Sequence, residues 1–452
     1  MRKLLLLLAV VCFSVVQVFA QSALIVKQEG RKVYFDISDF KEKPKVNDTF
    51  NITFWGTELK NPKTGKVLGK TIEHRLSGVI NVVEELFAVG TVNDLKDEKL
   101  EGVEATIEKA VVVTPPAQQE PAAQVVQDKV LPLWQSTPLE NKATAVAAAD
   151  IDGDGASELV LAYGDNNIKT YTLQDNKLVE GNGFQFAAFN RIITLDAADL
   201  NKNGTAEIFI GYFDSFRGRL STAVYEFKDG KFTETATITG LVKGIAPYNK
   251  ERVLYVQKLE NIGGKLKYLT PAILTYNGKS YKEGERVNTY KFHNIFGFNF
   301  GNFKEGSSKE NLIFTQQSGR LRLQFEKKGS YLNSPSGYDF ATTPTRLDYA
   351  NNMLRFYASL ALYNAADDNP VVAGIVNEAK LGILSDTFGS YHRGKLVFLK
   401  WDGSSLEYRN EAPFGGYAVD LVQGSLGDYK DVIIVPFMTG ADQTTVAIFQ
   451  EK

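Results

Sequence analysis

Two short acidic loops carry the side chains of this sequence that are best suited to bind a metal ion. The first runs Asp150-Ile-Asp-Gly-Asp-Gly-Ala-Ser-Glu158 and the second Asp199-Leu-Asn-Lys-Asn-Gly-Thr-Ala-Glu207. Each loop places oxygen side chains at positions one, three, five and nine, with glycine at position six. Hard oxygen donors on a loop with a glycine turn are typical of calcium sites. The sequence therefore predicts one or two structural calcium ions.

Each loop leads directly into an apolar segment with strand character, Leu159–Tyr163 after the first and Ile208–Tyr212 after the second. An EF-hand needs flanking helices and a glutamate at loop position twelve, where this chain has Leu161 and Ile210. The loops are therefore not EF-hands. A structural turn that holds no ion is the other interpretation.

The pattern Asp-x-Asp-x-Asp-Gly-x-x-Glu, followed by a strand, resembles the calcium loops of the FG-GAP and VCBS repeat families. This resemblance spans residues of about 140–450 and implies that each loop joins the first two strands of a β-propeller blade. The ligands implied in the first loop are the side chains of Asp150, Asp152, Asp154 and Glu158 and the carbonyl of Ala156. Those implied in the second loop are the side chains of Asp199, Asn201, Asn203 and Glu207 and the carbonyl of Thr205. We expect the first loop to bind calcium more tightly, because it has more carboxylates.

Strand-like segments recur through the rest of the chain at a spacing of roughly 45–60 residues. Equivalent core strands start near Leu159, Ile208, Val253, Leu312, Val371 and Val432. Tight hairpin turns such as Asp229-Gly230 and Asn277-Gly278 follow in most units, since these dipeptides accept positive φ. Units of four strands indicate a β-propeller. We predict an all-β fold with six blades over residues 131–452, and seven blades is the alternative count.

The sixth unit ends at Lys452, directly after its third strand, and so lacks a fourth. An unassigned apolar segment, Lys129–Ser136, lies before the first unit. We predict that Leu131–Gln135 pairs with the third strand of the last unit and closes the ring. Pro132 is compatible with this position, because an outer strand has one unpaired edge.

The N-terminus has the features of a secretory signal peptide over residues 1–20. Arg2 and Lys3 precede an apolar run from Leu4 to about Val18, which ends in small residues up to Ala20. A membrane anchor is the alternative, but the run is shorter than the roughly 20 apolar residues of a spanning helix. The one cysteine, Cys12, lies in this segment, so the mature chain would form no disulfide. We expect bacterial export, a periplasmic, secreted or envelope-associated location, and no transmembrane segment after cleavage.

A small β module occupies residues 21–113, where Ala23–Val26, Lys32–Ile37, Thr49–Trp55, Val67–Ile72 and Gly78–Val83 have strand character. These strands predict a compact barrel or sheet. Residues 114–130 are rich in proline, alanine and glutamine and predict a linker. The segments Asn61–Gly69, Ser77–Val83 and Phe87–Gly90 resemble the C-terminal domain of the bacterial flagellar assembly protein T, and no flagellar function follows from that alone.

No catalytic motif stands out. The three histidines, His74, His293 and His392, are far apart, and the chain has no nucleophile elbow, phosphate-binding loop or dinucleotide motif. The formal charge of −2 gives no general attraction to nucleic acid or to an anionic membrane. We therefore predict a protein that is not an enzyme.

The predicted function is that of a binding or scaffold protein for a protein or glycan ligand in the cell envelope. The alternatives are a calcium-dependent, lyase-like carbohydrate-active enzyme and an accessory factor of a flagellar or secretion-type machine. Tyrosine and phenylalanine are frequent around residues 331–363, where we expect most rings to lie in the core. The segment Ser334–Tyr338 is our candidate for an exposed contact surface.

Overall fold

The computed structural model describes residues 20–40, 42–46, 48–60, 67–92, 95, 98–108, 130–246, 251–262, 265–287, 294–303, 310–325, 331–349, 352–364, 369–380, 389–440 and 442–450. The regular elements of this part are all strands, and none of its segments is a helix able to cross a membrane. The chain divides into two compact units, residues 1–122 and 123–452. The predicted signal peptide, apart from Ala20, and the linker up to residue 129 lie outside the described residues.

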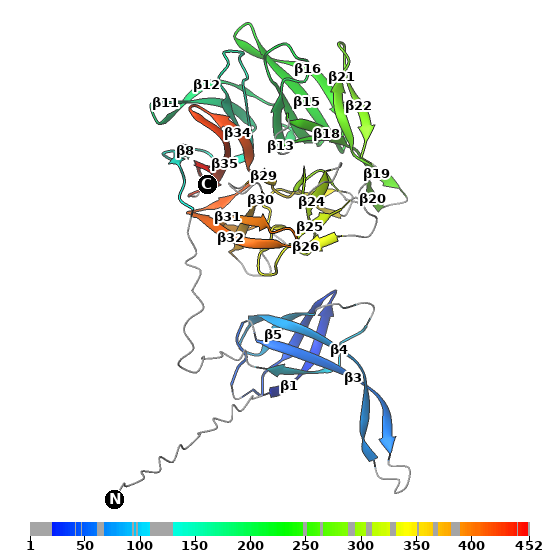
Figure 1. The fold of residues 1–452 in the computed structure, drawn as a ribbon. Coiled ribbons are helices and arrows are strands. Elements are labelled where there is room, and N and C mark those ends of the chain that lie inside the picture. The colour runs from blue at the N-terminus through cyan, green and yellow to red at the C-terminus, as the bar shows by residue number, and fades with distance from the viewer. Residues whose placement is uncertain are drawn as a thin grey trace, which may run out of the picture. The chain divides into compact units, whose positions relative to one another are not determined.

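The first unit contains a closed barrel of six strands (Figure 1). They are β1 (Ala20–Glu29), β2 (Lys32–Asp36), β3 (Thr49–Lys60), β4 (Val67–Val83), β5 (Phe87–Val92) and β6 (Glu104–Glu108). Their order is β1-β2-β5-β4-β3-β6, and pairing of β1 with β6 closes the barrel. The predicted barrel is confirmed. The prediction of separate strands at 67–72 and 78–83 is wrong, because β4 runs unbroken for 17 residues.

Phe50 fills the middle of the barrel, where its ring lies 4.7 Å from that of Phe35. Glycines on two neighbouring strands leave the room for it. A Cβ atom at Gly78 would lie 2.2 Å from the Phe50 ring, and one at Gly90 would lie 2.4 Å from it. Since real Cβ atoms do not approach this closely, the barrel core depends on both glycines.

The second unit contains a six-bladed propeller, which excludes the alternative of seven blades. Blade 1 holds β9 (Ala143–Ala149), β10 (Glu158–Tyr163), β11 (Asn167–Gln174) and β12 (Lys177–Gln185), and blade 2 holds β13 (Asn190–Ala198), β14 (Glu207–Asp214), β15 (Arg219–Lys228) and β16 (Lys231–Thr239). Blade 3 holds β17 (Leu241–Ile245), β18 (Val253–Gln257), β21 (Ala272–Tyr276) and β22 (Tyr281–Arg286), and blade 4 holds β23 (Phe298–Gly301), β24 (Asn311–Thr315), β25 (Leu321–Gln324) and β26 (Tyr331–Asn333). Blade 5 holds β29 (Ala361–Asn364), β30 (Pro370–Ala379), β31 (Tyr391–Trp401) and β32 (Leu406–Phe414). In blade 6, β33 (Tyr417–Ala418) and β34 (Val422–Leu426) both pair with β35 (Tyr429–Met438), which pairs with β36 (Gln443–Phe449).

The blades form a ring because neighbouring blades contact one another all the way round, from β9 with β13 to β34 with β9. Apolar side chains fill the interfaces; Val160 of blade 1 shares a cluster with Leu195 and Ile208 of blade 2. The six predicted core strands are β10, β14, β18, β24, β30 and β35, which are the second strands of their blades. The predicted turn at Asp229-Gly230 has positive φ at both residues.

The propeller unit also contains two hairpins that are not part of the blade sheets. One is β19 (Leu259–Ile262) with β20 (Lys265–Tyr268) inside blade 3, and the other is β27 (Arg346–Tyr349) with β28 (Asn352–Arg355) between blades 4 and 5. Phe340, Phe356 and Tyr357 are buried around the second hairpin, as expected for core rings. The prediction of an exposed surface at Ser334–Tyr338 is wrong for Ser334, whose Oγ accepts the N–H of Leu321 in the core.

The start of the propeller supplies the outer strand of its last blade. Ile448 of β36 pairs with Trp134 and Ala447 with Gln135, in β7 (Trp134–Gln135). A second short strand, β8 (Leu139–Glu140), continues along β36. Trp134 is 8% exposed, and its indole N–H donates to the Asn176 carbonyl of blade 1. The predicted closure of the ring is confirmed.

A buried network of charges crosses the inside of the ring. Lys243 Nζ of blade 3 lies 2.7 Å from Asp420 of blade 6 and 3.8 Å from Asp196 of blade 2. Arg252 also contacts Asp196, which is fully buried, and Asp420 accepts the N–H of Ser359 at 2.6 Å. The positive charges of Lys243 and Arg252 thus balance the negative charges of Asp196 and Asp420. In a ring of six, blades 3 and 6 are opposite one another, so this network ties together distant parts of the ring.

Trp134→Ala should destabilise the propeller by about 3–5 kcal/mol, because it opens a cavity in the closing contact. Chemical denaturation monitored by circular dichroism measures this loss. Leu131→Ala is the matched control, since Leu131 is 76% exposed in the same segment; its effect should stay within about 0.5 kcal/mol. Equal losses in the two variants would contradict the assignment of Trp134 as the closing contact.

Lys243→Met should destabilise the fold by about 3–5 kcal/mol, because it leaves Asp420 in the core without its cation. Asp420→Asn in the same chain removes the uncompensated charge and keeps an oxygen for the Ser359 N–H. The double variant should therefore lose less stability than the two single variants together, as a double-mutant cycle on the denaturation midpoints would show. Strict additivity would mean that the two side chains are not coupled.

Candidate metal centre

The first acidic loop joins β9 to β10 and is held in shape by its own side chains. The two carboxylate oxygens of Asp150 accept the N–H groups of Gly153 at 2.8 Å and Gly155 at 2.9 Å. Both glycines have positive φ, near 81° and 89°, which residues with a Cβ rarely adopt. The Asp-Gly-Asp-Gly sequence therefore sets the loop conformation before any ion binds.

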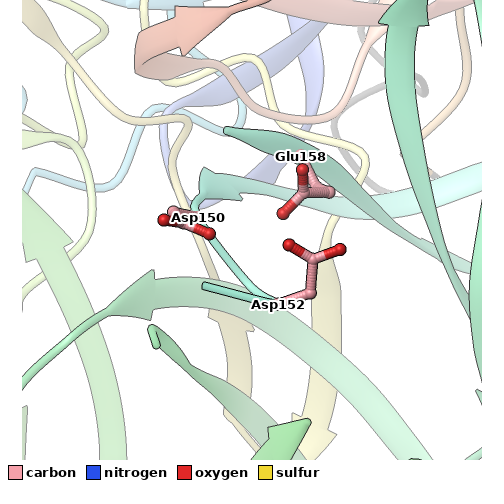
Figure 2. Close-up of side chains that lie close together, drawn as sticks. All are labelled: Asp150, Asp152 and Glu158. Atoms are coloured by element: carbon pink, nitrogen blue, oxygen red, sulfur yellow. The ribbon is translucent and has the colours of Figure 1, made fainter. Parts of the chain in front are cut away.

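Three carboxylates of this loop come together. Ligand oxygens of Asp150, Asp152 and Glu158 lie within 4.8 Å of one another. Figure 2 shows the carboxylates of Asp152 and Glu158 facing each other, with Asp150 beside them. Asp154 is not in this group, and its Oδ1 accepts the N–H of Ala156 at 2.7 Å. Among the described residues this is the one group of three or more acidic, histidine or cysteine side chains close enough to hold an ion.

Glu158 is the unusual member of the group, because it is a buried carboxylate with one unsatisfied oxygen. It is 3% exposed; its Oε2 accepts the N–H of Ile151 at 2.8 Å, whereas its Oε1 is buried without a hydrogen-bond partner. Burial raises the pKa of Glu158 to about 7, and the charges of Asp152, Asp154 and Asp150 add to the rise against the Ile151 N–H. A hard cation would satisfy the free oxygen and compensate the charges, so the residues of this loop fit Ca²⁺.

In the second loop, between β13 and β14, protein donors reach both carboxylate oxygens of the buried glutamate. Glu207 is fully buried, and its Oε2 accepts the N–H of Leu200 at 2.8 Å. Its Oε1 accepts the hydroxyl of Tyr281 at 2.6 Å, from the first residue of β22 in blade 3. Burial still raises the pKa of Glu207, and the Tyr281 and Leu200 hydrogen bonds oppose that rise. The second loop therefore satisfies its glutamate with protein donors.

Glu226 of β15 contacts the second loop, and we did not predict this contact from the sequence. Its Oε1 accepts the side-chain amides of both Asn201 and Asn203. The available signal was the strand register: Tyr225 pairs with Ile208, which places Glu226 at the loop end of the blade. Tyr281 had no comparable signal, since it comes from another blade.

The two loops contact each other and share one conformation. The N–H of Ala206 in the second loop donates to the Asp150 carbonyl in the first at 2.7 Å. Thr205 corresponds to Ala156, and its N–H donates to Asn203 Oδ1 at 2.9 Å. Asp199 Oδ2 accepts the N–H of Gly204, as Asp150 Oδ2 accepts that of the equivalent Gly155, while Asp199 Oδ1 accepts the N–H of Asn203. The sequence equivalence of the loops is thus an equivalence of structure as well.

A known family matches this part of the chain. Residues 150–210 match the FG-GAP-like repeat family. The FG-GAP-like segment starts at the first ligand position of the first loop and ends inside β14, so it contains both loops. No curated protein gives a significant match.

Several solved structures resemble the chain at low identity. One is BBS1N, solved in complex with ARL6DN, with 9% identity, a TM-score of 0.37 and coverage of 72% of this chain and 99% of that chain. A chain of the mitotic checkpoint complex has 7% identity, a TM-score of 0.37 and coverage of 76% and 98%. A mutant Aleuria aurantia lectin in complex with alpha-methyl-L-fucoside has 11% identity, a TM-score of 0.37 and coverage of 69% and 97%. These identities and TM-scores are too low to indicate a function for the chain.

In the presence of a chelator, the stability of the protein should fall as pH rises from about 4.5 to about 7. In the unfolded chain Glu158 has its ordinary pKa of about 4.5, whereas in the folded chain its pKa is about 7. Because the folded state binds more protons in this window, rising pH favours unfolding. Glu158→Gln should remove this pH dependence and raise the free energy of unfolding by about 1–3 kcal/mol above pH 7.

Denaturant midpoints measured across this pH range test the effect. Asp402→Asn is the control, because N–H groups of Ser405 and Ser404 lower the pKa of Asp402 to about 2, outside the window. Its profile should run parallel to that of the wild type. A Glu158→Gln profile that is also parallel would show that Glu158 does not titrate as the structure indicates.

Proposed function

We propose that the chain is an exported bacterial propeller that binds a protein or glycan ligand in the cell envelope and that calcium stabilises it. The observation that carries the calcium assignment is the buried, unsatisfied Oε1 of Glu158 beside Asp150 and Asp152. Export is supported by the basic and apolar N-terminal sequence up to Ala20 and by the absence of cysteine after Cys12.

The first loop would hold the ion through the carboxylate groups of Asp150, Asp152 and Glu158. Asp154, whose Oδ1 accepts the Ala156 N–H, and the carbonyl of Ala156 would complete the ligands. The bound ion supplies positive charge that balances these carboxylates and fixes the loop between β9 and β10. The second loop, with Asp199, Asn201, Asn203, Glu207 and the carbonyl of Thr205, is the weaker site. Tyr281 competes with an ion for Glu207, and Glu226 holds the amides of both asparagines.

Binding is favoured over catalysis by the surroundings of the described histidines. His74 stacks on Phe54 with the ring centroids 4.2 Å apart, and His392 lies 3.9 Å from Glu378 on the surface. His74 also lies 3.7 Å from Glu98, but among the described residues neither histidine belongs to a group of three side chains close enough to hold a metal ion. His293 lies outside those residues. The propeller instead offers a rigid ring whose loops at either end form contact surfaces.

Titration calorimetry with Ca²⁺ on the chelator-treated protein tests the proposal. We expect binding with a dissociation constant of the order of 10⁻⁴–10⁻³ M, as in other extracellular modules. Millimolar calcium should then stabilise the fold by about 1 kcal/mol, which a thermal melt detects. Asp152→Ala should abolish most of this binding, whereas Asn201→Ala should leave most of it.

The two alanine variants are matched in loop position and differ only in the loop that they alter. Equal losses would contradict the assignment of the first loop as the main site. No heat and no thermal shift in the wild type would leave the loops as structural turns without an ion, and the calcium part of the proposal would be wrong.

A further inference from the structure

We propose that the propeller docks on a phospholipid bilayer with anionic headgroups through two exposed phenylalanines, Phe189 and Phe216. Phe189 lies in the turn between β12 and β13, and Phe216 lies in the turn between β14 and β15. The surface formed by these residues with Arg191, Arg217 and Arg219 is called the Phe-Arg edge below. This inference does not depend on the proposed calcium site.

The two phenylalanine side chains protrude together into water. Phe189 is 71% exposed and Phe216 is 79% exposed, although their rings contact each other edge to face with centroids 5.3 Å apart. Isolated exposed apolar residues are common, but a paired aromatic cluster at this exposure is the kind of apolar feature that marks an interaction site. The pair therefore needs a partner that removes both rings from water.

Hydrogen bonds to buried side chains fix the backbone of both turns. The buried Asn166 donates from Nδ2 to the carbonyls of Ala187 at 3.1 Å and Asn190 at 2.6 Å, on either side of Phe189. The buried Asp214 accepts the N–H group of Phe216 at 3.0 Å. Fixed turns present the two rings in one arrangement, so little conformational freedom is lost when they insert into a partner.

Arginines outnumber carboxylates at the edge around the two rings. Three arginines lie there with Asp214 and with the exposed Asp165 of the neighbouring turn. Arg217 is paired with Asp214 at 3.0 Å, which neutralises the nearest carboxylate. Arg191 and Arg219 are exposed, and the contacts of the described residues include no carboxylate partner for either. They lie at the same end of blade 2, because Arg191 pairs with Phe213 and Arg219 with Asp214 in the strand register. Guanidinium groups bind phosphate well, and an anionic surface attracts them.

The shape of the edge favours a bilayer over a protein partner. The rings stand out from the turns, with most of their surface in water. A protein would need a matching cavity for two protruding rings, whereas acyl chains close around them without one. The overall charge of −2 is small, so the local arginines decide the interaction with an anionic surface.

The Phe-Arg edge and the calcium loops lie at opposite ends of the blades. Adjacent strands of blades 1 and 2 are antiparallel, so the turn after the second strand is at the other end from the loop after the first. Docking would leave the acidic loops facing away from the negative surface. Failure of calcium binding and failure of docking are therefore separate outcomes.

Co-sedimentation with vesicles tests the proposal, using the chain that begins at Gln21 so that the apolar N-terminal segment does not contribute. In the presence of a chelator, we expect it to bind vesicles of phosphatidylglycerol and phosphatidylethanolamine more strongly than vesicles of phosphatidylcholine. Phe189→Ser with Phe216→Ser should lower the partition coefficient by roughly tenfold or more. Arg191→Gln with Arg219→Gln should weaken binding to the anionic vesicles and reduce its salt dependence.

The matched control is Leu131→Ser, which removes an equally exposed apolar side chain, 76% exposed, from another part of the propeller. It should bind like the wild type. Thermal melts should show that all these variants fold, since the altered side chains are exposed. An equal loss of vesicle binding in the control and in the double phenylalanine variant would overturn the proposal. So would the absence of vesicle binding by the wild type, which is the result expected if the edge binds only a protein.

A fluorescent label gives a second readout of insertion. The chain from Gln21 has no cysteine, so Ser215→Cys places a single environment-sensitive label beside Phe216. Its emission should shift to the blue on anionic vesicles. Ser404→Cys, in the exposed turn between β31 and β32 at the opposite end of blade 5, should show no shift. Equal shifts at the two positions, or none at Ser215→Cys, would overturn the proposal.

Discussion

The pairing of β36 with β7 is the contact on which the rest of the propeller depends. Each blade is a twisted sheet whose faces are covered by its two neighbours, so the ring is stable only when no face is left open. Trp134 fixes this contact from both sides, because it pairs with Ile448 and donates to Asn176 of blade 1. The Lys243–Asp420 pair adds a second constraint from inside the ring. Together they position the acidic loops of blades 1 and 2.

The two acidic loops show two solutions to one electrostatic problem. Both fold around a buried glutamate whose backbone partner is the second residue of its own loop, Ile151 or Leu200. In the second loop a hydroxyl from the next blade satisfies the remaining oxygen, and Glu226 supplies one of the two negative charges that the asparagines lack. In the first loop no protein donor reaches the remaining oxygen. Under the proposed function, an ion would satisfy the free oxygen of the first loop, whereas in the second loop it would compete with existing hydrogen bonds.

The parts of the fold that were predictable from sequence are those written in local patterns. The spacing of apolar strands identified the second strand of all six blades, and the missing fourth strand of the last unit predicted the role of Trp134. Contacts between distant residues left no such pattern. Lys243 and Asp420 are 177 residues apart, and Tyr281 reaches Glu207 from another blade. The exposure of Phe189 and Phe216 was equally unpredictable, because it depends on how two separate turns meet.

The ring closure also sets an order of events during synthesis. Trp134 is made before the strands of all six blades, and its partner Ile448 is made only after those of the first five, so five blades exist before the sixth can be completed. Until then the growing chain has an open blade with an unpaired strand edge, and contacts this distant in sequence form slowly. The same edge can accept the first strand of a second copy, which would give an exchanged dimer instead of a closed monomer. The speed with which the two ends of one chain meet therefore decides between these products.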